Sequence, residues 1–137
     1  MMSESITKAE KTTILRNSIS HLLEELTVDY QNTRQERKEI AVQYPPSDEQ
    51  FSLLEELELL TVTIRGYASQ IQAQGRIKNE SEAIQALQEI SIFEFAKIYQ
   101  FYFNSENQFG QIKYYIRMLD YLRLLTLEYL RLSPNTL

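Results

Sequence analysis

Apolar residues recur three and four positions apart in four segments of the chain, which is the spacing of one face of an α-helix. The four segments cover residues 15–44, 53–71, 84–102 and 108–132. The second is the most regular, and its stripe consists of Leu54, Leu57, Thr61, Ile64, Ala68 and Ile71. The pattern therefore predicts four long helices.

Turn-forming residues separate the predicted helices. Pro45 and Pro46 end the first helix, because the residue before a proline is pushed out of the helical conformation. Gly75 is a typical stop for the second. Within the third, Ser91 opens a Ser-Ile-Phe-Glu stretch that is also typical of a helix start. A break of the third helix near Ser91 is therefore the alternative to one continuous helix.

The composition agrees with a helical fold. The 137 residues include only three glycines and three prolines. Long helices with short connections need few such residues, whereas sheets need many turns. We therefore predict an all-α fold, an up-and-down four-helix bundle. We expect a single helical domain over residues 1–137, with residues 1–10 as a disordered N-terminal tail.

Aromatic residues gather in the C-terminal half, where nine of the fifteen lie between Phe93 and Tyr115. There the third and fourth helices are apolar on most sides, and such helices need neighbours on most sides. Four helices of one chain cannot bury this much apolar surface, so we predict a self-association or partner surface. Its expected residues are Phe93, Tyr99, Phe103, Tyr114, Met118 and Tyr121. A large core with some exposed tyrosine is the alternative interpretation.

The expected partner is a second copy of the chain, in a homodimer, or another protein. Nucleic-acid binding is an alternative, in which Lys113, Arg117 and Arg131 would contact phosphates. The net charge of −5 gives that alternative no general electrostatic attraction. Asp120 and Glu128 also lie among the three basic residues. An apolar ligand held among the aromatic side chains is a further alternative.

Few residues suited to catalysis or metal binding occur. The chain has no cysteine and a single histidine, His21. This is too few for a zinc site, and no Glu-x-x-His pair suggests a di-metal bundle. No phosphate-binding loop or dinucleotide-binding glycine pattern is present. We therefore expect no metal, no cofactor and no enzymatic activity.

One short motif suggests an enzymatic alternative. Arg16 is followed by Asn17, three further residues and His21. This resembles the Arg-polar-x-x-x-His motif of HEPN-type ribonucleases, which are helical and often dimeric. The resemblance implies that Arg16 would steady a phosphate and His21 would act as acid or base in metal-independent RNA cleavage. A solvated arginine and a surface histidine are the alternative interpretation.

The N-terminal residues are polar, and no apolar run reaches the length of a membrane span, so we expect a cytoplasmic location. Taken together, the sequence predicts a non-enzymatic, all-α interaction or regulatory module that acts through protein–protein contacts.

Overall fold

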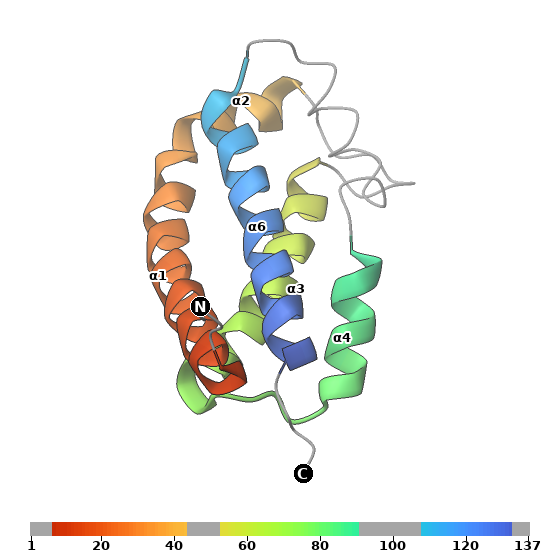
Figure 1. Ribbon diagram of the computed structural model, residues 1–137. Coiled ribbons are helices and arrows are strands. Elements are labelled where there is room, and N and C mark those ends of the chain that lie inside the picture. Colours follow the sequence, from red (N-terminus) through yellow and green to blue (C-terminus); the bar gives the residue numbers. More distant parts are fainter. Residues whose placement is uncertain (1–6, 44–52, 91–107, 133–137) are drawn as a thin grey trace.

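The computed structural model describes residues 7–43, 53–90 and 108–132, and all the regular elements within these ranges are helices (Figure 1). They are α1 (Lys8–Asn32), α2 (Arg34–Gln43), α3 (Leu53–Gln74), α4 (Glu80–Glu89) and α6 (Gly110–Leu132). The predicted all-α class is therefore confirmed for the described part of the chain.

Helix α6 is the central helix of this arrangement. It packs most extensively against α1, and it also contacts α3, α4 and α2. Figure 1 shows α1 and α4 running in one direction, with α3 and α6 running in the other. The short helix α2 crosses the end of this group of helices at which α6 begins. Every other described helix thus reaches α6, and the core forms around it.

The core is built from apolar residues at helical spacing. On α3, Leu57, Ile64, Ala68 and Ile71 of the predicted stripe are buried, whereas Leu54 and Thr61 are only partly buried and Leu53 and Leu60 take their places in the core. The fully or nearly fully buried members of the core include Ile19, Leu26, Ile64, Ala68, Ile71, Leu87, Leu119 and Leu122. Burying a leucine or isoleucine side chain contributes about 1.5–3 kcal/mol to folding. Helix α6 alone buries ten residues, more than any other described helix. Its orientation about its own axis is consequently well determined.

The prediction of a single helix over residues 15–44 is wrong, because the helix is interrupted at Thr33, which separates α1 from α2. Thr33 is fully buried, and its hydroxyl donates to the Tyr30 carbonyl at 2.7 Å. The Arg37 Nε donates to the Thr33 hydroxyl oxygen at 3.0 Å, and its guanidinium carbon lies 4.1 Å from the centre of the Tyr30 ring. These contacts hold the bend that carries α2 across the start of α6.

The third predicted helix does not run continuously through residues 84–102. Helix α4 ends at Glu89, and Ile90 has extended backbone angles, φ −71° and ψ 127°. The chain therefore leaves the helix one residue before Ser91, as in the alternative with a break there. The remainder of this predicted helix lies outside the described residues.

The ends of α1 and α4 use local caps. The Thr7 side chain accepts from the Glu10 N–H, and Glu10 accepts from the Thr7 N–H in return, so α1 begins within the tail that was expected to be disordered. At the start of α4, the Asn79 side chain accepts from the Glu82 N–H. Such side chains satisfy backbone donors that have no partner within the helix.

The start of α6 is capped by another helix. The Glu36 carboxylate of α2 accepts from the backbone N–H groups of Gln111 at 3.1 Å and Ile112 at 2.8 Å. A carboxylate at this position is also favoured by the positive end of the helix dipole. Glu36 thereby ties the polar helix α2 to the central helix α6.

Two helix ends are capped by arginines from other helices. Arg16 of α1 donates to the Gln72 carbonyl at the end of α3, at 3.0 Å. Arg123 of α6 donates to the Leu87 carbonyl at the end of α4, at 2.8 Å. Both carbonyls belong to the last turn of their helix and have no partner within it. A cation there is also favoured by the negative end of the dipole.

Gly75 ends α3, as the sequence predicts. It has φ +78°, in the left-handed region that favours glycine. Its carbonyl accepts from the Tyr129 hydroxyl of α6 at 2.6 Å. A Cβ atom at this position would lie 2.9 Å from Nη1 of Arg16. The turn after α3 is therefore held by α1 and α6 together.

Two glycine substitutions should have opposite effects on stability. We expect Gly75→Ala to lower the free energy of unfolding by about 1–2 kcal/mol, since an L-residue is strained at positive φ. Gly66→Ala is the matched control, because Gly66 lies within α3 and its Cβ would meet no atom within 4 Å. It should raise the free energy of unfolding by about 0.5–1 kcal/mol. Urea unfolding measures both, and equal effects would contradict the prediction.

Removing the cap on α6 should destabilise the fold. We expect Glu36→Gln to lower the free energy of unfolding by about 1 kcal/mol, because the negative charge is lost at the helix start and one oxygen acceptor is replaced by a donor. Glu39→Gln, an exposed site one turn along α2, is the matched control and should change stability little. Equal unfolding midpoints for the two variants would refute the role of Glu36.

Candidate protein interface

Six side chains of α6 form a continuous solvent-exposed stripe, here called the α6 face. The residues of the α6 face are Tyr114, Arg117, Tyr121, Leu124, Glu128 and Arg131. Three of them are large and apolar or aromatic, with 41% of Tyr114, 50% of Tyr121 and 47% of Leu124 exposed. An exposed cluster of this kind on one helix is typical of a surface that binds a partner.

The core fixes the direction in which the α6 face points. Tyr115, Leu119 and Leu122 lie on the opposite side of α6 and are completely buried. Rotating the helix to hide the α6 face would bring these side chains into water, at a cost of roughly 1.5–3 kcal/mol for each. The exposure of Tyr121 and Leu124 is therefore a consequence of core packing.

The electrostatics of the α6 face are mixed. The guanidinium carbon of Arg117 lies 5.9 Å from the centre of the Tyr114 ring, within the range of a cation–π interaction. Glu128 forms a long ion pair, 3.7 Å, with Lys11 of α1, and both side chains are about half exposed. Exposed pairs of this kind contribute at most about 1 kcal/mol. Glu128 is thus available to a second cation.

The structure places three of the six predicted interface residues. Tyr114 and Tyr121 belong to the α6 face, whereas Met118 is partly buried and packs against the core beside them. Phe93, Tyr99 and Phe103 lie outside the described residues. On α6, the two exposed members of the predicted interface, Tyr114 and Tyr121, lie on the same side of the helix.

The three basic residues of the nucleic-acid alternative also lie on α6. Arg117 and Arg131 are exposed, and Lys113 is partly buried. They share this side of the helix with Glu128 and with Asp120, which accepts from the Nε of Arg123 at 2.8 Å. The positive charges are therefore interrupted by negative ones along the helix.

The residues of the ribonuclease-like motif are occupied by other contacts. Arg16 caps α3, and the exposed His21 lies 2.8 Å from a carboxylate oxygen of Glu25. Five residues along a helix amount to about 500°, so the two side chains leave α1 about 140° apart. Within the chain the structure therefore does not bring Arg16 and His21 together.

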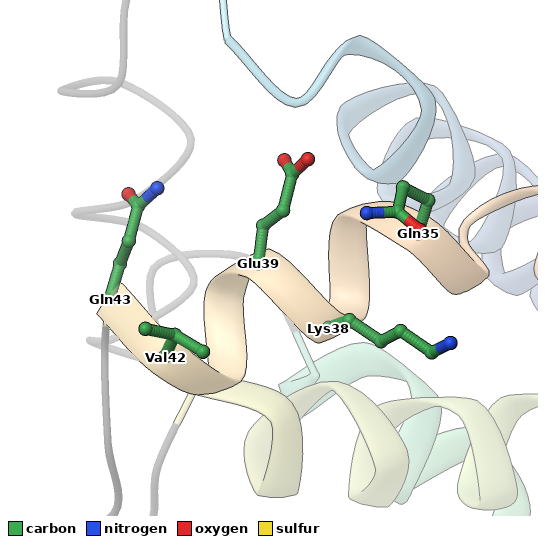
Figure 2. A pocket seen from close by; sticks show the side chains of 5 residues that line it. All are labelled: Gln35, Lys38, Glu39, Val42 and Gln43. Atoms are coloured by element: carbon green, nitrogen blue, oxygen red, sulfur yellow. The ribbon is translucent and has the colours of Figure 1, made fainter.

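The recesses on the described surface are open and shallow. The one in Figure 2 has a volume of about 360 Å³ and is lined by residues of α2 alone, among them Lys38, Glu39 and Val42. These side chains point away from one another and do not converge on a common point. Within residues 7–43, 53–90 and 108–132, no group of three or more histidine, aspartate or glutamate side chains is arranged to hold a metal ion.

A smaller recess of about 190 Å³ lies between α1 and α6. Asp29 and Asn32 line it on one side, and Gly110, Gln111 and Tyr114 on the other. Burial raises the pKa of the Asp29 carboxyl, and the nearby Glu25 carboxylate raises this pKa further. The recess adjoins the α6 face through Tyr114.

Beneath the α6 face, Tyr115 anchors α6 to α1 and α3. Its ring centre lies 5.3 Å from that of Tyr30, and its hydroxyl lies 3.4 Å from the Thr61 hydroxyl. Burial raises the pKa of Tyr115, while Thr61 and Arg65 act to lower it. The ring therefore sits in the core with its single polar atom near polar groups of α3.

None of the described helices combines the length and the apolar character needed to cross a bilayer. Comparisons with models of protein families, with curated proteins and with solved structures give no match for this chain.

Sequence reasoning missed Leu124, which belongs to the α6 face. Apolar residues cover a wide arc of α6, more than half of its circumference, and the spacing alone does not show which of them are exposed and which are buried. Leu125 and Tyr129, which lie on the same arc, are buried. The signal for Leu124 was its spacing, three residues after Tyr121 and four before Glu128.

The raised pKa of Tyr115 predicts a loss of stability at alkaline pH. In the unfolded chain a tyrosine ionises near pH 10, whereas in the folded protein Tyr115 holds its proton to higher pH. Its contribution to stability is therefore complete below about pH 10 and is lost as the pH rises toward the folded pKa.

We expect Tyr115→Phe to make the free energy of unfolding fall less steeply above about pH 10 than in the wild type. Urea unfolding at a series of alkaline pH values measures the slope. The same slope in both proteins would show that Tyr115 is not responsible.

Proposed function

We propose that this protein is a non-catalytic helical interaction module that self-associates through the α6 face. In this proposal the complete chain forms an up-and-down four-helix bundle, and the α6 face is its contact surface. The observation that carries the proposal is the exposed stripe centred on Tyr121 and Leu124, which core packing turns toward solvent.

The chemistry of the α6 face supports a protein partner. Tyrosine is enriched at interfaces because its ring buries apolar area while its hydroxyl keeps a hydrogen bond. Tyr121 and Leu124 lie at the middle of the stripe, and charged residues lie toward both ends. A central apolar cluster with a polar rim is typical of protein–protein interfaces.

The alternation of positive and negative charge on the α6 face also favours a protein partner over nucleic acid. A surface that binds nucleic acid neutralises phosphates with clustered basic residues. On the α6 face, Glu128 lies between Arg117 and Arg131. Such an order is better suited to a partner that carries both signs of charge, as a second copy does.

A charge placed at the centre of the α6 face should reduce self-association. We expect the wild type to show a mass above that of one chain in size-exclusion chromatography with light scattering, and Tyr121→Glu to shift it toward the single-chain mass. The physical reason is that a carboxylate would be buried there without a partner.

Val62→Glu is the matched control, since Val62 is 64% exposed on α3 and both variants introduce a glutamate. It should associate like the wild type, and circular dichroism should show all three proteins equally helical. A wild type that keeps the mass of one chain from micromolar to millimolar concentration would refute the proposed function.

A further inference from the structure

The residues of the α6 face follow one another at alternating intervals of three and four positions, from Tyr114 to Arg131. This is the spacing of the a and d positions of a heptad, the pattern by which two helices pack along a common seam. All six positions are exposed in the structure. Helix α6 therefore presents to solvent six positions with the spacing of a seam, three of them apolar or aromatic and three charged, and a separate buried face to its own core.

The order of residues along this seam is self-complementary when two copies of α6 run in opposite directions. With a twofold axis between Leu122 and Arg123, Tyr121 lies opposite Leu124 of the second copy. The symmetry repeats this contact, because Leu124 then lies opposite Tyr121 of the second copy. Two apolar pairs thus form the centre of the seam.

The same register matches the charges on either side of the centre. Arg117 lies opposite Glu128 of the second copy, which is an attractive pair, and Tyr114 lies opposite Arg131, which permits a cation–π contact. Glu128 would then lie between Lys11 of its own chain, already 3.7 Å away, and Arg117 of the second copy. No like charges face each other along the seam.

A parallel arrangement lacks this complementarity. It would place Arg117 against Arg117 and Glu128 against Glu128, and like charges facing each other at an interface are unfavourable. It would also align the two helix dipoles in the same direction, whereas antiparallel helices bring opposite ends together. The charges therefore select the antiparallel arrangement.

Building on the proposed function, we propose that two copies of this protein pair through an antiparallel α6–α6 seam in which Arg117 of each copy faces Glu128 of the other. The seam runs from Tyr114 to Arg131, about 26 Å at 1.5 Å per residue. One helix from each copy gives a contact at the small end of specific interfaces, so the dimer should be reversible.

Charge reversal tests the register. We expect Arg117→Glu and Glu128→Arg each to weaken dimerisation by about tenfold or more, because the twofold axis places two repelling pairs in every dimer. Mixing the two variants should restore dimerisation, since the introduced glutamate of one variant then faces the introduced arginine of the other. The native Glu128 of the first variant likewise faces the native Arg117 of the second. The double variant, which carries both reversals in one chain, should also dimerise.

Analytical ultracentrifugation over a concentration series measures these affinities. Arg76→Glu and Glu58→Arg are the matched controls, because they make the same charge changes at exposed positions outside the α6 face. Both controls should dimerise like the wild type. Circular dichroism shows whether each variant is folded before its mass is interpreted.

Disulfide formation provides a second measurement, because the chain has no cysteine of its own. A mixture of Tyr114→Cys and Arg131→Cys should form a covalent heterodimer on mild oxidation. Tyr114→Cys alone should not, since the antiparallel seam separates its two copies by about 26 Å, far beyond the reach of a disulfide. Efficient cross-linking of Tyr114→Cys alone would indicate a parallel seam and overturn the inference.

The outcomes separate this inference from the proposed function. If the wild type associates and Tyr121→Glu disrupts it, but the mixture of charge variants is no tighter than either alone, the antiparallel register is wrong and self-association through the α6 face stands. If the wild type has the mass of one chain at every concentration, both fail.

Discussion

The buried side of α6 is the constraint on which the described structure depends. Helices α1, α2, α3 and α4 all contact α6, and α6 buries ten of its own residues. Because so much apolar surface is lost from water on one side, the helix cannot rotate without a large cost in free energy. The exposed side of α6 is fixed by the same packing. The candidate interface is thus determined by the core beneath it.

Charged side chains secure the ends of helices that the core holds side by side. Glu36 binds the start of α6, while Arg16 and Arg123 bind the ends of α3 and α4. Each joins two helices by satisfying backbone groups that would otherwise lack partners. Arg16 also shows why a short motif needs its structural setting. Its guanidinium is engaged in a contact between helices, and His21 is exposed elsewhere on α1.

The α6 face combines an apolar centre with charges of both signs, and this combination gives the proposed interaction its direction. Apolar burial would provide most of the affinity, whereas the charge order would select the antiparallel partner. In this proposal Tyr121 and Leu124 would serve the first purpose, and Arg117 and Glu128 would serve the second. None of these four side chains is buried in the core, because all four are exposed on the described surface.

The sequence by itself determined the helical class, the stop at Gly75 and the inward stripes of the helices, such as Leu57, Ile64 and Ile71 on α3. These follow from local backbone preference and from the 3.6-residue period. Only the tertiary structure decided the break at Thr33 and which edge of the wide arc of α6 is exposed. Local periodicity describes the faces of a single helix, whereas burial depends on where neighbouring helices lie against it.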